Sequence, residues 1–194
     1  MQVPLFPLFT VLLPGGQLPL RIFEPRYLDM LSDCFRNSSG FGVCQIREGI
    51  EAGGSAVPFS TGTLVQIANW DKGDDGLLNV LVEGRQKFAV QSTRVMSDKL
   101  LVGEVELLEP ERSCPVPEKQ RSLSTLLEQV FEQMNWDADL SQPRFDDALW
   151  VGSRLLELLP MPKQRRQTLF ECDDPLDRLE GLSDYIRDSV GRMN

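Results

Sequence analysis

The sequence contains no histidine among its 194 residues. This absence excludes Ser-His-Asp and Cys-His catalytic arrangements and removes the commonest metal ligand. The four cysteines, Cys34, Cys44, Cys114 and Cys172, are widely spaced and form no CxxC pair. We therefore expect no metal site and interpret the cysteines as reduced thiols of a cytoplasmic protein.

Long apolar runs and positive charge are also scarce. No apolar stretch approaches the roughly 20 residues that a membrane span needs, and the first seven residues lack the positive region of a secretory signal. Lys and Arg number 20 against 29 Asp and Glu, which gives a net charge of −9. Because nucleic acids and anionic membranes are bound mainly through positive charge, neither is an expected partner.

The motifs of common catalytic sites are missing or incomplete. The segment from Gly49 to Ser55 has the outer glycine spacing of a phosphate-binding loop, but Ser55 stands where the lysine is needed. The acidic pairs Asp74-Asp75, Asp146-Asp147 and Asp173-Asp174 fall in a predicted turn and at two predicted helix starts, where negative charge is favourable. We predict no catalytic, cofactor-binding or metal-binding residue, and a carboxylate-based hydrolase is a minor alternative.

Residues 1–110 predict a β-rich part with one helix. The helix should begin at Pro25, carry Leu28, Leu31 and Phe35 on its apolar face, and stop near Asn37. Prolines in the first two extended pieces suit sheet edges, and Gly84 is typical of a bulge or sharp bend. The expected strands are 3–8, 17–20, 41–47, 62–70, 77–82, 87–95 and 100–108.

Three prolines between Glu109 and Pro117 mark a connector, and the residues beyond it follow helical periodicity. Apolar stripes predict helices over 123–134 and 145–159, a short one after Pro162, and a last one that Asp174-Pro175 opens and whose apolar stripe runs to Val190. The predicted fold class is α+β. It comprises a small β-barrel or bent mixed sheet with one helix (1–110), followed by an all-α helical bundle (111–194).

The opening segment carries the most specific pattern. It reads Pro4-Leu-Phe-Pro-Leu8, Val11-Leu-Leu-Pro-Gly15 and Leu18-Pro-Leu-Arg-Ile-Phe-Glu-Pro-Arg-Tyr-Leu-Asp-Met-Leu31. Later blocks are Gly62-Thr63 with Val65 and Ile67, Glu83–Val90, Leu159–Arg165 and Asp173–Leu179. Together these blocks resemble the N-terminal substrate-binding domain of Lon proteases and the Lon-like portion of cereblon. The resemblance implies a PUA-like β part followed by a helical part. The Lon ATPase and serine–lysine peptidase have no counterpart in these residues, so we expect a stand-alone, non-catalytic module.

Two residue sets follow from this interpretation. The motif residues Pro14, Arg21, Phe23, Glu24, Arg26, Tyr27 and Gly84 are interpreted as mainly structural. In particular, Glu24 should cap the helix and pair with Arg21 and Arg26, while Phe23 should pack as a hydrophobic staple. The candidate peptide-binding surface is apolar and comprises Phe6, Phe9, Leu12, Leu13 and Trp70. Plain core is the competing interpretation for those five residues.

The function expected from the resemblance is recognition of unfolded or degron-bearing polypeptides, as an adaptor or holdase. Self-association and a complex with a protease or chaperone are further partner expectations. The alternative of a PUA-like RNA-binding protein requires a basic cleft and is disfavoured by the net charge. A purely structural or assembly role is the remaining alternative.

Overall fold

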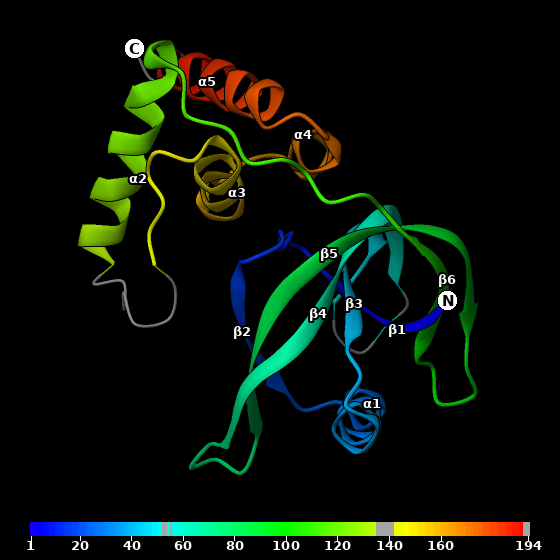
Figure 1. The fold of residues 1–194 in the computed structure, drawn as a ribbon. Coiled ribbons are helices and arrows are strands. Elements are labelled where there is room, and N and C mark those ends of the chain that lie inside the picture. The colour runs from blue at the N-terminus through cyan, green and yellow to red at the C-terminus, as the bar shows by residue number, and fades with distance from the viewer. Residues whose placement is uncertain (52–53, 55, 135–141, 192–194) are drawn as a thin grey trace. The chain divides into compact units, whose positions relative to one another are not determined.

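The computed structural model describes residues 1–51, 54, 56–134 and 142–191. The chain forms two compact units, Met1–Pro110 and Glu111–Asn194. Figure 1 shows that the first unit holds all the strands and one helix, whereas the second is helical. No helix among the described residues combines the length and apolar character that a membrane span requires.

The first unit is built on one six-stranded mixed sheet with the strand order β2-β5-β4-β3-β1-β6. Its elements are β1 (Gln2–Leu8), β2 (Gln17–Ile22), α1 (Pro25–Asn37), β3 (Phe41–Gly49), β4 (Ala56–Lys72), β5 (Leu78–Val95) and β6 (Leu101–Leu107). The strand β5 also pairs with β6 through its second half, from Phe88 to Val95, so the sheet bends strongly. In contrast, β2 pairs only with β5 among the described strands. A closed barrel has no free edge, so the bent mixed sheet is confirmed and the barrel version is wrong.

The placement of β1 differs from the sequence expectation. Its prolines suggested an edge, yet β1 lies between β3 and β6. Residues Gln2–Leu5 pair with β6 and residues Leu5–Leu8 pair with β3. Because each half is paired on one side only, Pro4 and Pro7 can lack an amide proton without breaking a central ladder. The expectation of an edge position is confirmed for β2.

A bulge at Gly84 joins the two strands that the sequence suggested into the single strand β5. In the β4–β5 pairing, Leu64 faces Gln86 and Val65 faces Gly84, so Arg85 is the extra residue. A Cβ at Gly84 would lie 2.3 Å from the carbonyl oxygen of Leu13. The bulge therefore needs glycine because the backbone of the preceding loop passes directly against it.

That loop ends in a type II turn. The amide of Gly16 donates to the carbonyl of Leu13 at 3.0 Å, and Gly15 has φ 74°. Pro14 therefore occupies the position that favours proline, and Gly15 the position that requires positive φ. Gly15 donates to Gly84 and Gly84 donates to Gly16, each at 2.9 Å, which fixes the turn against β5.

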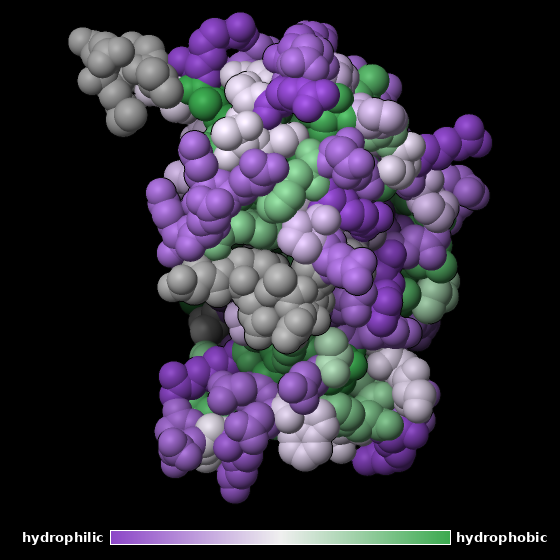
Figure 2. Space-filling view, turned by 60° about the vertical axis from the view of Figure 1, so that its left-hand side comes forward, coloured by the Kyte–Doolittle hydropathy of each residue, from purple (hydrophilic) through white to green (hydrophobic). Residues whose placement is uncertain are grey.

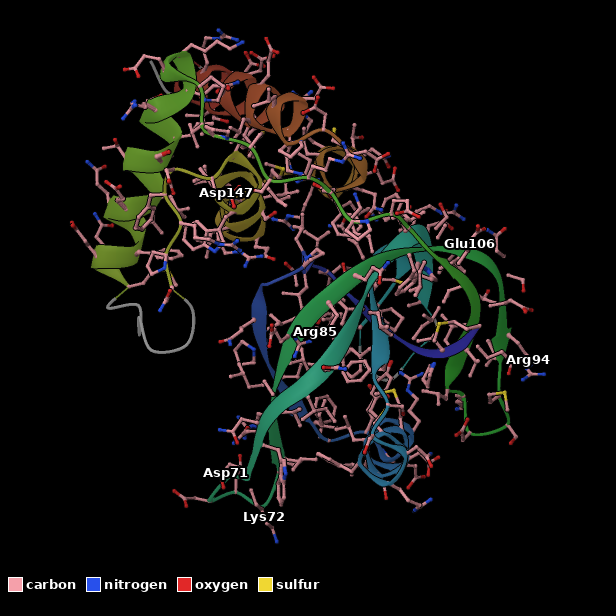
Figure 3. The ribbon with its side chains drawn as sticks, viewed as in Figure 1. Asp71, Lys72, Arg85, Arg94, Glu106 and Asp147 are labelled. Carbon is pink, nitrogen blue, oxygen red and sulfur yellow. The ribbon has the colours of Figure 1, made fainter. Side chains whose placement is uncertain are left out.

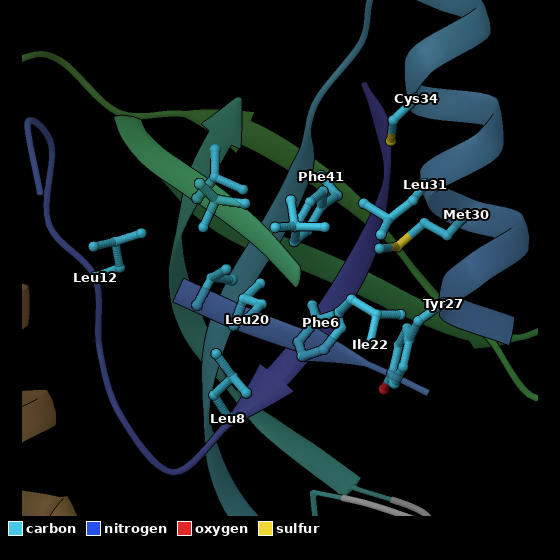
Figure 4. Close-up of a cluster of buried hydrophobic side chains, with 14 residues drawn as sticks. Phe6, Leu8, Leu12, Leu20, Ile22, Tyr27, Met30, Leu31, Cys34 and Phe41 are labelled. Carbon is cyan, nitrogen blue, oxygen red and sulfur yellow. The ribbon is translucent and has the colours of Figure 1, made fainter. Parts of the chain in front are cut away.

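The main core of the first unit lies between α1 and the sheet (Figure 4). Helix α1 has the predicted bounds, but its buried face is Tyr27, Met30, Leu31 and Cys34. Leu28 and Phe35, which the stripe placed inward, are exposed. Spacing alone could not choose between these neighbouring faces, because both repeat at three and four residues.

The second unit contains α2 (Arg121–Gln133), α3 (Ala148–Leu158), α4 (Lys163–Glu171) and α5 (Pro175–Gly191), with the short 3-10 helix η1 (Glu118–Gln120) before α2. The four predicted helices are confirmed with small changes at their ends. Asp147 caps α3 by accepting from Leu149 at 3.0 Å, and Asp174 accepts from the amide of Leu176 at 2.8 Å. Ser55 and the side chain of Val190 lie outside the described residues.

Candidate functional site

Two clefts lie side by side in the β-rich unit and share the residues Glu24, Tyr27 and Glu51. The larger cleft has a volume of about 600 Å³ and the smaller one about 310 Å³. Both volumes fall in the range of ordinary ligand-binding cavities. We call the two clefts together the shared groove, and the larger and smaller parts cleft 1 and cleft 2.

Four segments far apart in the sequence line cleft 1. These are Pro7 of β1, the start of α1, the residues Glu51, Gly54 and Ala56 between β3 and the start of β4, and the β5–β6 hairpin, which Figure 3 marks through Arg94. The hairpin turn is held against α1, because the Arg26 guanidinium donates to the carbonyl oxygen of Lys99 at 3.0 Å. The lining residues are Pro7, Glu24, Pro25, Arg26, Tyr27, Glu51, Gly54, Ala56, Val95, Ser97, Asp98, Lys99 and Leu101.

Cleft 2 is mostly apolar. Its floor comes from β1 and β2, which place alternate side chains on the core side of the sheet. The apolar lining residues are Phe6, Leu8, Leu18, Pro19, Leu20, Ile22 and Phe23. Arg21 also lines cleft 2, but its guanidinium forms an ion pair with Asp75 on the β4–β5 hairpin. The cleft therefore offers an apolar surface with little competing positive charge.

Glu24 and Arg26 form an ion pair at the groove. Arg26 Nη2 lies 2.9 Å from Glu24 Oε2, and both side chains are mostly buried. The Arg26 guanidinium carbon also lies 4.6 Å from the centre of the Tyr27 ring, a cation–π contact. The pairing of Glu24 with Arg26 is confirmed. The predicted cap is wrong, because the Glu24 side chain forms no capping hydrogen bond to α1.

Tyr27 belongs both to the core and to the groove. Its ring centre lies 4.1 Å from that of Phe6, and Figure 4 shows its hydroxyl pointing away from the buried cluster. Burial raises the pKa of Tyr27; Arg26 lowers it, whereas Glu24 and Glu51 raise it. Tyr27 therefore remains protonated near neutral pH and can donate a hydrogen bond.

The five residues predicted to form one peptide-binding surface are not brought together on the surface. Phe6, Leu12 and Leu13 are buried, so they belong to the core and cannot form an exposed apolar patch. Phe6 still lines cleft 2. Phe9 and Trp70 are exposed, and Trp70 packs edge-on against Phe35 of α1 at 5.8 Å.

Two motif residues have roles that the sequence did not indicate. Phe23 was expected to pack as a staple, but the residue is 56% exposed. The alternation of β2 explains this, because Leu20 and Ile22 point inward and Phe23 follows on the outward side. Arg21 was expected to pair with Glu24 but pairs with Asp75.

Sequence reasoning missed the other side of the groove. Glu51 follows β3, and Val95, Asp98 and Lys99 lie in the β5–β6 hairpin. Their only sequence signal is that each lies at or beside a turn, and loops often carry functional residues. Nothing in their spacing indicates that they meet the start of α1.

Within the part of the chain that the structure describes, no group of three or more Cys, Asp or Glu residues is arranged to hold a metal ion. Burial raises the pKa of the Cys44 thiol to about 12, so this thiol is a poor nucleophile. Hydrophilic residues dominate the face shown in Figure 2, where hydrophobic residues form separate patches.

Comparison with known families identifies the chain. The model of the ATP-dependent protease La (LON) substrate-binding domain matches residues 2–188. The chain belongs to this Lon family. A solved Lon N-terminal domain protein from Xanthomonas campestris is 41% identical, with a TM-score of 0.78 over 95% of this chain and 98% of that one. The N-terminal domain of Lon protease from Mycobacterium avium complex shares the fold, with a TM-score of 0.67 at 16% identity over 97% of this chain and 99% of that one.

Two curated proteins extend the comparison of this Lon-family chain. Lon protease 2 of Herpetosiphon aurantiacus is 27% identical over 98% of this chain and 24% of its own length. Protein cereblon of Xenopus tropicalis is 32% identical over 60% of this chain and 26% of its own length. The chain thus spans about a quarter of the length of these curated relatives. The predicted resemblance to the Lon N-terminal domain is confirmed.

Proposed function

We propose that this protein binds extended or unfolded polypeptide segments in the shared groove without chemical turnover. The observation that carries the proposal is the adjacency of an apolar cleft and a charged cleft, joined through Glu24, Tyr27 and Glu51. Such a groove suits a flexible chain, because apolar side chains provide binding energy and polar groups at the wall provide orientation. The family description, a substrate-binding domain, supports the same function.

Exposed apolar side chains at the groove support binding of apolar segments. Phe23 borders cleft 2 and Val95 borders cleft 1, and these two residues are 56% and 64% exposed. A bound segment would remove part of this surface from water, which stabilises the complex. The outer edge of β2, which pairs only with β5 among the described strands, lies beside cleft 2, but Pro19 in its middle lacks an amide proton. We therefore assign recognition to side-chain contacts in the groove rather than to strand addition.

A role as an adaptor or holdase follows from this proposal. A groove that holds an unfolded segment delays its aggregation and presents it to a protease or chaperone partner. Self-association of the chain would place several grooves near one substrate and raise the overall affinity. The non-catalytic character rests on the chemistry at the groove, where the Glu24 carboxylate pairs with Arg26 and the Tyr27 hydroxyl keeps its proton.

The binding experiment uses the full chain and N-terminally acetylated, fluorescein-labelled apolar peptides, followed by fluorescence anisotropy. Phe23→Ser removes an exposed aromatic ring at cleft 2, and Trp70→Ser is the matched control with 58% exposure outside both clefts. Loss of a half-buried aromatic contact is worth about 1.4 kcal/mol, or about tenfold in Kd. We expect this weakening for Phe23→Ser and a change below about twofold for Trp70→Ser, on the same scale.

Two results would contradict the proposal. The first is the absence of saturable binding for every peptide and for a reduced, unfolded model protein. The second is loss of binding in Trp70→Ser with unchanged binding in Phe23→Ser, which would move the site to the outer end of β4. Circular dichroism of both variants controls for folding, and their exposed positions favour native structure.

The charge of the groove disfavours the RNA-binding alternative. Cleft 1 is lined by the carboxylates of Glu24, Glu51 and Asp98, and RNA phosphates would be repelled by them. We propose that nucleic acid is not a partner. An RNA oligonucleotide added at low salt should cause no mobility shift, and a shift that weakens steeply with salt would restore this alternative.

A further inference from the structure

The shared groove contains more negative than positive charge once its own ion pairs are removed. Arg26 pairs with Glu24, and Arg21 pairs with Asp75 outside the groove. The charged lining residues that remain are Glu51, Asp98 and Lys99. Two carboxylates therefore face one ammonium group. The whole chain, with a net charge of −9, adds to this negative potential.

Glu51 has the central position among these three residues, because it lines both clefts. Its carboxylate accepts a hydrogen bond from the backbone amide of Phe9. This bond fixes one carboxylate oxygen. No ion pair among the described residues involves the Glu51 carboxylate. The side chain is half-buried, and its charge contributes to raising the pKa of Tyr27.

The apolar cleft and this carboxylate are adjacent, so one extended segment can contact both. Cleft 2, at about 310 Å³, has room for one large apolar side chain. Its floor is apolar, because it is formed by Phe6, Leu8 and Leu20. A neighbouring residue of the same segment then reaches the wall at Glu51. A cation there would form a charge-assisted contact in a half-buried setting, where charge pairing is screened less than on an open surface.

We infer that the groove prefers segments in which a lysine or arginine lies beside a large apolar residue, with the cation at Glu51 and the apolar side chain in cleft 2. This inference rests on the proposed function and specifies its substrate class. Acidic segments and apolar segments without a cation are the poorer ligands. The salt dependence of binding reports the charge contact separately from the apolar contact.

The test uses three acetylated, amidated peptides that share one apolar sequence and differ at a single position, which is Lys, Gln or Glu. Binding to the full chain is measured by anisotropy at low salt and at 0.5 M salt. We expect the Lys peptide to bind about fivefold more tightly than the Gln peptide at low salt, with the Glu peptide weakest. At 0.5 M salt the difference should fall below about twofold.

The variants assign the preference to one residue. Glu51→Gln keeps the size and one acceptor oxygen of the side chain and should abolish the Lys-over-Gln preference. Glu48→Gln is the matched control, because Glu48 lies three residues earlier, does not line the groove and pairs with Arg47. The control should retain the fivefold preference.

The outcomes separate this inference from the proposed function. Equal binding of the three peptides, with loss of affinity in Phe23→Ser, overturns the cation preference and leaves polypeptide binding intact. A preference that survives in Glu51→Gln overturns the assignment to Glu51. Absence of binding for all three peptides and for unfolded protein overturns both.

Discussion

Replacement of Arg178 by methionine should destabilise the helical unit strongly. Arg178 is fully buried, and its guanidinium donates to both carboxylate oxygens of Glu111, at 2.6 and 2.8 Å. It also donates to the carbonyls of Leu169 at 3.0 Å and Cys172 at 2.5 Å. One side chain thus joins the start of the unit, the end of α4 and the first turns of α5.

The magnitude follows from what the substitution leaves behind. The Glu111 side chain is 6% exposed, so Arg178→Met leaves a buried carboxylate without its cation. Removal of one partner of a buried ion pair costs about 3–5 kcal/mol. Two backbone carbonyls lose a donor as well, although water can reach part of the opened space. Since total stabilities are on the order of 5–15 kcal/mol, the variant should be markedly less stable.

A double-mutant cycle tests this reasoning. The wild type, Arg178→Met, Glu111→Gln and the double variant are unfolded in urea and followed by circular dichroism at 222 nm, which reports mainly the helices. We expect the double variant to recover about 1–3 kcal/mol relative to Arg178→Met, because the uncompensated charge is gone. A loss below about 1 kcal/mol in Arg178→Met, or no recovery in the double variant, would refute the account.

Three further predictions concern stability. Gly84→Ala should lower the free energy of unfolding in urea by about 1–3 kcal/mol, because the new Cβ would lie 2.3 Å from the Leu13 carbonyl oxygen. An unchanged midpoint of the urea transition would argue against this close approach. Asp147→Ala should cost about 1 kcal/mol and Asp147→Asn much less, since asparagine also caps helices; equal losses in both would exclude capping as the cause. Burial raises the pKa of Cys44 from 9.0 to about 12, so the unfolded chain loses this proton first. The contribution of Cys44 to stability should be constant below pH 9 and fall as pH rises toward 12. Cys44→Ala should make the fall in stability above pH 9 shallower, and a thiol reagent at pH 8 should leave native Cys44 unmodified.

Local signals predicted most of the individual elements. Pro25 at the start of α1 and the Asp174-Pro175 start of α5 are both confirmed. These features depend on backbone restrictions of single residues and on hydrogen bonds within a few positions. Gly84 was also interpreted correctly as a bulge, although β5 continues through it.

Features that depend on distant pairing were not predicted. One half of β1 pairs with β6 and the other half with β3. Because this pairing could be predicted only with both partner strands known, the prolines of β1 alone suggested an edge position. The burial of Arg178 requires Glu111, which lies 67 positions away. The periodicity of an amphipathic helix predicts that a charged residue is exposed, because a partner outside the helix does not enter the pattern.

The motif from Phe23 to Tyr27 shows why structural and binding roles should not be treated as alternatives. Tyr27 packs on Phe6 and holds the core, while the same side chain lines both clefts. Arg26 anchors the β5–β6 hairpin through the Lys99 carbonyl and thereby forms a wall of cleft 1. Substitutions at these two residues would disturb fold and groove together. Exposed Phe23 and half-buried Glu51 are therefore the positions at which binding can be separated from stability.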